Sequence, residues 1–235
     1  MASVGASSVW HCILLLAMVV LTGEGARAKR ILHTEAPSPS QGVCSNPPTV
    51  SNVSLEAYSG VWYEIGSTAL VKARIERDLI CATARYSVIP DGDLAGSIRV
   101  RNEGYNIRTG EFAHAIGTAT VVSPGRLEVK FFPGAPGGDY RIIYLSGKAE
   151  DKYNVAIVYS CDESVPGGSQ SLFILSREPE LDDEDDDDDD YDDDDETLSR
   201  LLNFVRDLGI VFEPNNEFIL TPQDPITCGR NGYDD

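Results

Sequence analysis

The sequence predicts an all-β protein in which eight strands follow one another along the chain. Between residues 60 and 177, short runs rich in Val, Ile, Tyr and Phe alternate with turn residues such as those of Pro90-Asp91-Gly92-Asp93. Residues 126–132 alternate between apolar and charged side chains, which is typical of a strand with one face in water. The chain has 235 residues, enough for one domain with its own core.

The turns between the runs are mostly tight, which favours an up-and-down antiparallel arrangement. Closing such a sheet into an eight-stranded barrel removes its exposed edges and leaves room inside for one small ligand. A sandwich of two sheets fits the same number of strands, so strand count leaves both architectures open. The predicted strands are 61–67, 80–89, 97–105, 112–122, 126–132, 140–146, 154–161 and 171–177.

The N-terminus has the pattern of a secretory signal peptide. An apolar run at 12–22 is followed by the small-x-small sequence Ala26-Arg27-Ala28, with Gly23-Glu24-Gly25 as a second cleavage site. No later run is long and apolar enough to span a bilayer, so we expect an exported protein. The predicted segments are a signal peptide at 1–28, a flexible segment at 29–43, a barrel at 44–181, a disordered polyacidic insertion at 182–196 and a C-terminal part with helix, strand and tail at 197–235.

Four cysteines remain once the signal peptide is removed, and an oxidising compartment favours two disulfide bonds between them. Spacing alone allows three pairings and does not fit a zinc site, because no two of these cysteines lie close together. Asn52 begins the sequon Asn52-Val53-Ser54, a candidate glycosylation site. The four are Cys44, Cys81, Cys161 and Cys228.

The insertion at 182–196 holds 14 acidic residues in 15 positions. Subtracting their charge from the net charge of −19 leaves −5 for the rest of the chain. Such a run has nothing to bury and repels itself, so the main expectation is a solvated, disordered segment. The alternatives are a basic protein partner and weak contact with Ca²⁺ or a calcium mineral, for which Asp185, Asp190 and Asp195 are representative ligands. The charge balance disfavours nucleic acid.

The region after the acidic run predicts a helix and a short strand. Leucine and valine recur at helical spacing over 196–210, and acidic residues before the helix suit the positive end of its dipole. Residues 217–221, EFILT, then read as a short extra strand.

Three segments resemble the lipocalin family. Gly60-Val61-Trp62-Tyr63-Glu64 resembles the G-x-W-Y-E motif of the first lipocalin strand, and residues 153–161 and 173–181 resemble the last two strands of the apolipoprotein D-like branch. The resemblance implies an eight-stranded antiparallel up-and-down barrel with one C-terminal α-helix and a short extra strand. It implies that Arg177 packs across Trp62 to close one end, with Gly60 at the start of the first strand. It also implies the disulfides Cys44–Cys161 and Cys81–Cys228.

The same resemblance implies a secreted, non-enzymatic carrier of a small hydrophobic ligand, such as a lipid, retinoid, steroid or pigment, with no cofactor. His33 and His114 stand alone in the sequence, so no catalytic arrangement can be assembled around them. We expect the segment 68–78 to act as a lid at the open mouth. The alternative function is an extracellular matrix or mineral-associated protein that works through its acidic run. The candidate wall residues, chosen by strand position and size, are Tyr86, Phe112, Phe131 and Tyr140.

Overall fold

A computed structural model describes residues 44–164, 168–181, 194–211 and 217–229. In these ranges the chain forms nine strands and four helices. The strands are β1 (Gly60–Thr68), β2 (Leu79–Val88), β3 (Ile98–Asn106), β4 (Glu111–Ser123), β5 (Arg126–Lys130), β6 (Gly138–Gly147), β7 (Tyr153–Asp162), β8 (Ser169–Ser176) and β9 (Phe218–Leu220). The helices are α1 (Leu55–Tyr58), α2 (Ala69–Arg74), α3 (Asp194–Asp207) and α4 (Pro225–Cys228).

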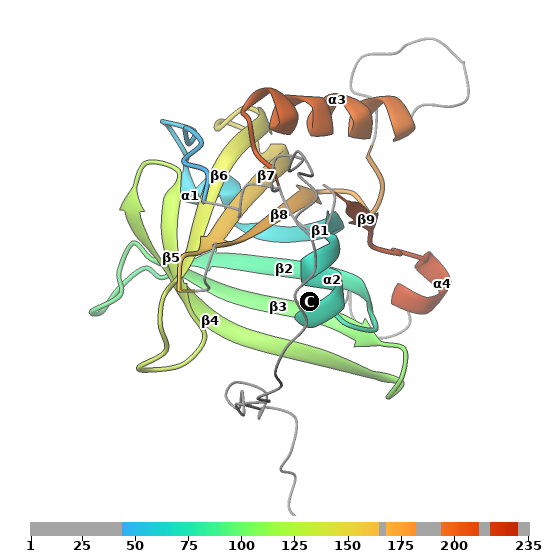
Figure 1. Ribbon diagram of the computed structural model, residues 1–235. Helices are drawn as coiled ribbons and strands as arrows, with labels where there is room; N and C mark the ends of the chain where they lie inside the picture. Colours follow the sequence, from blue (N-terminus) through green and yellow to red (C-terminus); the bar gives the residue numbers. More distant parts are fainter. Residues whose placement is uncertain (1–43, 165–167, 182–193, 212–216, 230–235) are drawn as a thin grey trace, which may run out of the picture. The chain divides into compact units, whose positions relative to one another are not determined.

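The first eight strands form a closed antiparallel barrel. Neighbours in sequence are neighbours in the sheet from β2 to β8, and β1 closes the barrel by pairing with both β8 and β2 (Figure 1). The expected eight strands and the barrel are therefore confirmed, and the two-sheet sandwich is excluded. β9 adds to the far half of β1, beyond the point where β1 and β2 separate.

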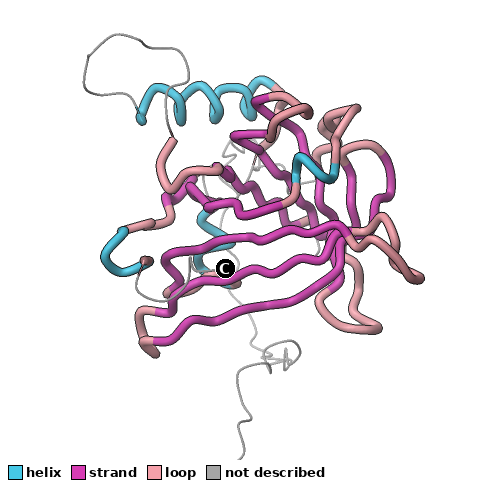
Figure 2. The backbone as a smooth tube through the Cα atoms, turned by 180° about the vertical axis from the view of Figure 1, so that it is seen from behind, coloured by secondary structure: helices cyan, strands magenta, loops and turns pink. Residues whose placement is uncertain are grey.

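Two apolar clusters lie on opposite faces of the barrel wall. The inner cluster draws buried side chains from all eight barrel strands, with Trp62, Val100 and Leu127 among them. The outer cluster joins one face of β1, β6, β7 and β8 to Leu201 and Val205 of α3. Alternate residues of the same strands thus face the barrel interior and the outer surface on which α3 packs. Figure 2 shows α3 lying along one side of the strands.

The helix after the acidic run begins earlier than expected. The sequence predicts disorder through residue 196, whereas the structure starts α3 at Asp194. Acidic residues in a first helical turn face the positive end of the helix dipole, which explains why the helix extends into the end of the acidic run. The rest of the insertion, residues 182–193, lies outside the described residues.

Both disulfides tie an outlying segment to the barrel. Cys44, at the start of the described chain, is linked to Cys161 of β7, and Cys81 of β2 is linked to Cys228 of α4. This is the pairing that the resemblance implies. The second bond holds the C-terminal tail beside the split between β1 and β2, where the backbone N–H of Cys81 also donates to the carbonyl of Pro222.

Candidate ligand-binding site

One end of the barrel is closed by Arg177 and Trp62. The guanidinium carbon of Arg177 lies 3.8 Å from the centre of the Trp62 ring, a cation–π contact, and Trp62 is fully buried. The guanidinium also donates to the backbone carbonyls of α1, β1 and β7, and burial lowers its pKa to about 10. Gly60 is required here because its φ is +107° and an added Cβ would come 3.2 Å from Arg177. The accepting carbonyls are those of Ala57, Tyr58, Ser59, Val61 and Tyr153.

Above this closed end, three tyrosine hydroxyls meet inside the barrel. The Tyr140 hydroxyl lies 2.7 Å from that of Tyr58 and 3.1 Å from that of Tyr86. We call these three residues the tyrosine cluster. Burial raises the pKa of Tyr86 to about 12 and raises the pKa values of Tyr58 and Tyr140 well above the ordinary range. The hydroxyls therefore stay protonated and neutral at physiological pH.

Beyond the tyrosine cluster, the inner wall of β3 and β4 is made of small side chains. Pairing of Val100 with Gly117 places both on the inner face, and the unbroken register then puts Asn102 opposite Ala115 on that face. Asn102 is exposed and Ala115 half-buried, although both face inward. Solvent therefore reaches the inner face of the barrel wall at this level.

Two of the four predicted wall residues lie on the inner face of the barrel. Tyr86 and Tyr140 face inward and belong to the tyrosine cluster. The prediction for Phe112 is wrong, because Phe112 pairs with Tyr105 on the outer surface, where the two rings lie 5.2 Å apart. The error is one of register, because a shift of one residue reverses every side chain of a strand. Phe131 lies just past the end of β5 and is 43% exposed, with its ring beside the inward-facing Gly117.

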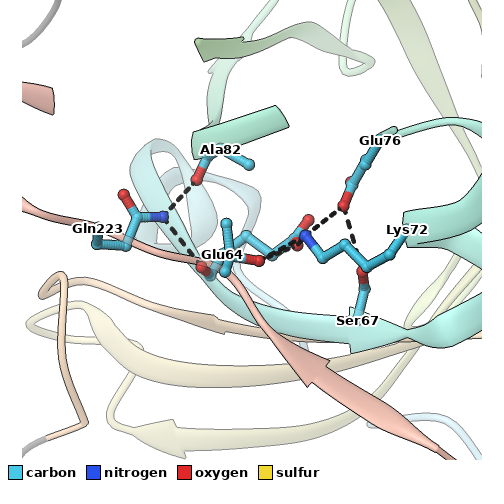
Figure 3. Close-up of polar contacts among 7 residues, drawn as sticks. Glu64, Ser67, Lys72, Glu76, Ala82 and Gln223 are labelled. Carbon is cyan, nitrogen blue, oxygen red and sulfur yellow. Dashed lines mark hydrogen bonds and ion pairs between the residues drawn. The ribbon is translucent and has the colours of Figure 1, made fainter. Parts of the chain in front are cut away.

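The expected lid segment 68–78 contains the helix α2 and carries a buried ionic network (Figure 3). The ammonium of Lys72 donates to Glu64 at 2.5 Å and to Glu76 at 2.7 Å. It also donates to Thr221, at 2.6 Å, and the Ser67 hydroxyl donates to Glu76 at 3.2 Å. We call these five residues the Lys72 network. It joins α2 to the inner face of β1, because Glu64 pairs with the inward-facing Leu175.

The Lys72 network holds two carboxylates for one ammonium, which perturbs its titration. Burial and the neighbouring Glu64 raise the pKa of Glu76 to about 8, in spite of the opposing effect of Lys72. Burial alone would lower the pKa of Lys72, but the two glutamates raise it overall. Glu76 therefore favours its protonated form at neutral pH, which lowers the negative charge beside Glu64.

The C-terminal tail closes the gap where β1 and β2 separate. The side-chain amide of Gln223 donates to the carbonyl of Glu64 at 3.0 Å and to that of Ala82 at 2.9 Å, so it bridges the two strands (Figure 3). The neighbouring Thr221 adds a hydroxyl bond to Glu64. The barrel wall is thus completed at this point by side chains that lie more than a hundred residues away in sequence.

A family model described as a lipocalin-like domain matches residues 53–188, more than half of the chain. The chain belongs to the lipocalin family. It is 35% identical over 123 residues to apolipoprotein D of Mus musculus, and 35% identical over 136 residues to the outer membrane lipoprotein Blc of Vibrio cholerae. The matches cover 51% and 57% of this chain, and 58% and 70% of those proteins. The chain thus spans little more than half the length of apolipoprotein D of Mus musculus, and it falls in the apolipoprotein D-like branch of the lipocalins.

Solved structures show the same lipocalin fold. Insecticyanin of the tobacco hornworm, Manduca sexta, has a TM-score of 0.57 and 21% identity, covering 80% of this chain and 89% of its own. The cockroach allergen Per a 4 has a TM-score of 0.54 and 16% identity, covering 79% of this chain and 98% of its own.

The remaining predicted site residues of this lipocalin lie at its surface or outside the described residues. His114 lies on the exposed outer face of β4, and the side chain of Asn52 is exposed just before α1. Glycosylation of Asn52 stays a prediction. Asp185, Asp190, His33 and the signal peptide lie outside the described residues, as does the side chain of Asp195. Within the described ranges, no three His, Cys, Asp or Glu side chains gather as a metal site would require, and no helix is long and apolar enough to cross a membrane.

Sequence reasoning missed three features of this lipocalin site. The small inner wall is visible in the sequence, because Ala113, Ala115, Gly117 and Ala119 alternate with larger outward residues. The role of Tyr58 carries no local signal, since its hydroxyl meets a residue 82 positions away. The Lys72 network also joins distant segments, and only the tertiary fold brings its members together.

Proposed function

We propose that this lipocalin is a secreted carrier that holds one small hydrophobic molecule inside its barrel. The observation that supports the proposal is the solvent-accessible inner face at Ala115 and Asn102, above a closed end and beside an apolar inner cluster. Moving apolar ligand surface out of water into such a space would drive binding. Secretion is proposed from the predicted signal peptide and from the two disulfides, which persist in oxidising compartments.

Blocking the interior tests this proposal directly. Ala115→Phe places a ring on the inner face of β4, in the space that a ligand would fill. We expect the variant to fold, because the space is open to solvent, and to lose at least about tenfold in affinity for a hydrophobic fluorescent probe. Fluorescence titration and thermal unfolding measure the two properties on the same sample.

The matched control is Ile116→Phe, one residue along the same strand. Ile116 faces outward and is 54% exposed, so this variant adds a ring without touching the interior. It should bind the probe as the parent protein does. Equal binding by the parent protein, Ala115→Phe and Ile116→Phe would place the probe outside the barrel and would refute the proposed site.

A further inference from the structure

The tyrosine cluster has a hydrogen-bond donor to spare. Each phenol carries one O–H, so Tyr58, Tyr86 and Tyr140 together supply three donors. The two bonds that join their hydroxyls use two of these donors. Within the described residues, the three hydroxyls bond only to one another, so the third O–H has no acceptor there. This third O–H is free to donate to solvent or to the oxygen of a ligand that reaches the cluster.

The cluster lies at the floor of the proposed ligand space. Tyr58, which packs on Trp62, is 1% exposed, and Tyr86, which stacks on Tyr58, is 6% exposed, whereas Tyr140 is only half-buried. The inward side chains of Ala84, Val129 and Phe173 are likewise only partly buried, and they pack against the same inner cluster. Tyr140, the central member of the hydroxyl chain, is thus the most exposed of the three tyrosines.

The charges around this floor favour a neutral ligand group. The guanidinium of Arg177 donates to backbone carbonyls and lies against Trp62, on the closed side of the cluster. The ammonium of Lys72 is held by two glutamates in its own network. A carboxylate at the cluster would therefore be buried without a cation dedicated to it, which is costly. A carbonyl oxygen needs only the donor that the cluster has to spare.

We propose that the tyrosine cluster binds a carbonyl oxygen of the ligand, and that the barrel selects hydrophobic ketones, aldehydes or esters over hydrocarbons and fatty carboxylates of similar size. The ligand would lie with its apolar body along the small inner wall of β3 and β4 and its oxygen at the floor. This inference rests on the proposed carrier function. It adds a subsite with defined chemistry to that function.

A pair of probes that differ only in a ketone tests the inference. Prodan carries a propionyl ketone on a dimethylaminonaphthalene, and its emission moves to longer wavelength when a donor bonds to that oxygen. The parent dimethylaminonaphthalene lacks the ketone. Both are titrated against the intact protein, against Tyr140→Phe and against the control Tyr144→Phe, which removes a hydroxyl from the outer face of the same strand, where Tyr144 packs on Phe204.

We expect Tyr140→Phe to bind prodan about tenfold more weakly than the intact protein does, as the loss of one hydrogen bond implies. The emission of prodan bound to this variant should shift to shorter wavelength. Dimethylaminonaphthalene, which lacks the ketone, should bind the intact protein, Tyr140→Phe and Tyr144→Phe equally. The double variant Tyr86→Phe/Tyr140→Phe removes a neighbouring hydroxyl that could replace the lost donor, and it should show at least the same loss.

Three results would overturn the inference. Equal weakening of both probes by Tyr140→Phe would assign the residue a packing role only. Unchanged prodan affinity and emission in both the single and the double variant would show that the cluster does not contact the ketone, although the carrier function would stand. Failure of the intact protein to bind either probe would refute the carrier function, and the inference with it.

Discussion

Arg177 combines the most interactions of any side chain at the closed end. It stacks on Trp62 and donates to five backbone carbonyls, four of them in α1, β1 and β7 and one at Ser59, between α1 and β1. The planar guanidinium suits this task, since its donors point in several directions within one plane while its face covers the indole. One residue at the end of β8 thus holds α1, β1 and β7 together.

Replacing Arg177 with Ala should therefore destabilise the barrel. We expect a loss of roughly 1–3 kcal/mol in the free energy of unfolding, because the carbonyls lose their donor and the indole loses its cover. In protein lacking residues 1–28, Trp62 is the only tryptophan, so its emission should also shift to longer wavelength. Denaturant unfolding followed by fluorescence measures both effects.

The control for this substitution is Arg101→Ala. Arg101 lies on the exposed outer face of β3 and pairs with Glu103. Such a surface ion pair contributes little, so this variant should change the unfolding free energy by less than about 1 kcal/mol. If both substitutions had the same small effect and left the Trp62 emission unchanged, the closure of the barrel by Arg177 would be refuted.

At the scale of elements, the Lys72 network attaches α2 to the barrel, and the stability of this attachment depends on the protonation of Glu76. Glu76 has a pKa of about 8 in the folded protein, against an ordinary value of 4.5. Because the folded pKa is the higher one, the protonated form of Glu76 favours folding. Its contribution is complete below about pH 4.5 and is lost as the pH rises through about 8.

Glu76→Gln should remove this pH dependence. The neutral amide keeps a carbonyl oxygen for Lys72 and an N–H for Glu64, and it cannot ionise. At about pH 9 we expect the variant to be more stable than the parent protein by at least about 1 kcal/mol, with the difference shrinking toward about pH 5. Thermal unfolding across this pH range makes the measurement.

Glu128→Gln serves as the control, since Glu128 pairs with Lys130 at the surface, where both side chains are more than 40% exposed. It should follow the parent protein at every pH. A parent protein whose stability does not fall between about pH 6 and 9, or a Glu76→Gln variant that falls with it, would contradict the assigned network.

The same elements show what sequence can predict. Alternation and turn residues locate all eight barrel strands, and the motifs at Trp62 and Arg177 indicate how the barrel closes. It is harder to predict which side chains of a strand face inward, because Phe112 and Ala113 are adjacent and only the strand pairing decides which of them faces the interior. The Lys72 network could not be predicted, since Lys72 and Thr221 are 149 residues apart.

At the scale of the whole molecule, most of the net negative charge is concentrated in one segment of the sequence. Fourteen of the acidic charges lie in residues 182–196, and the remainder of the chain carries a formal charge of only −5. The barrel interior is mostly apolar, with neutral phenols at its floor, and Lys72 is paired with Glu64 and Glu76 at the inner face of β1. A neutral interior of this kind suits an uncharged hydrophobic ligand.

Native mass spectrometry of the protein from the organism that produces it tests the central claim most directly, because the ligand would be weighed together with its carrier. We predict the mass of the chain with its two disulfides plus one small hydrophobic molecule, which added prodan displaces one for one. A protein that carries no small molecule and takes up no hydrophobic probe would contradict the claim that this lipocalin is a carrier.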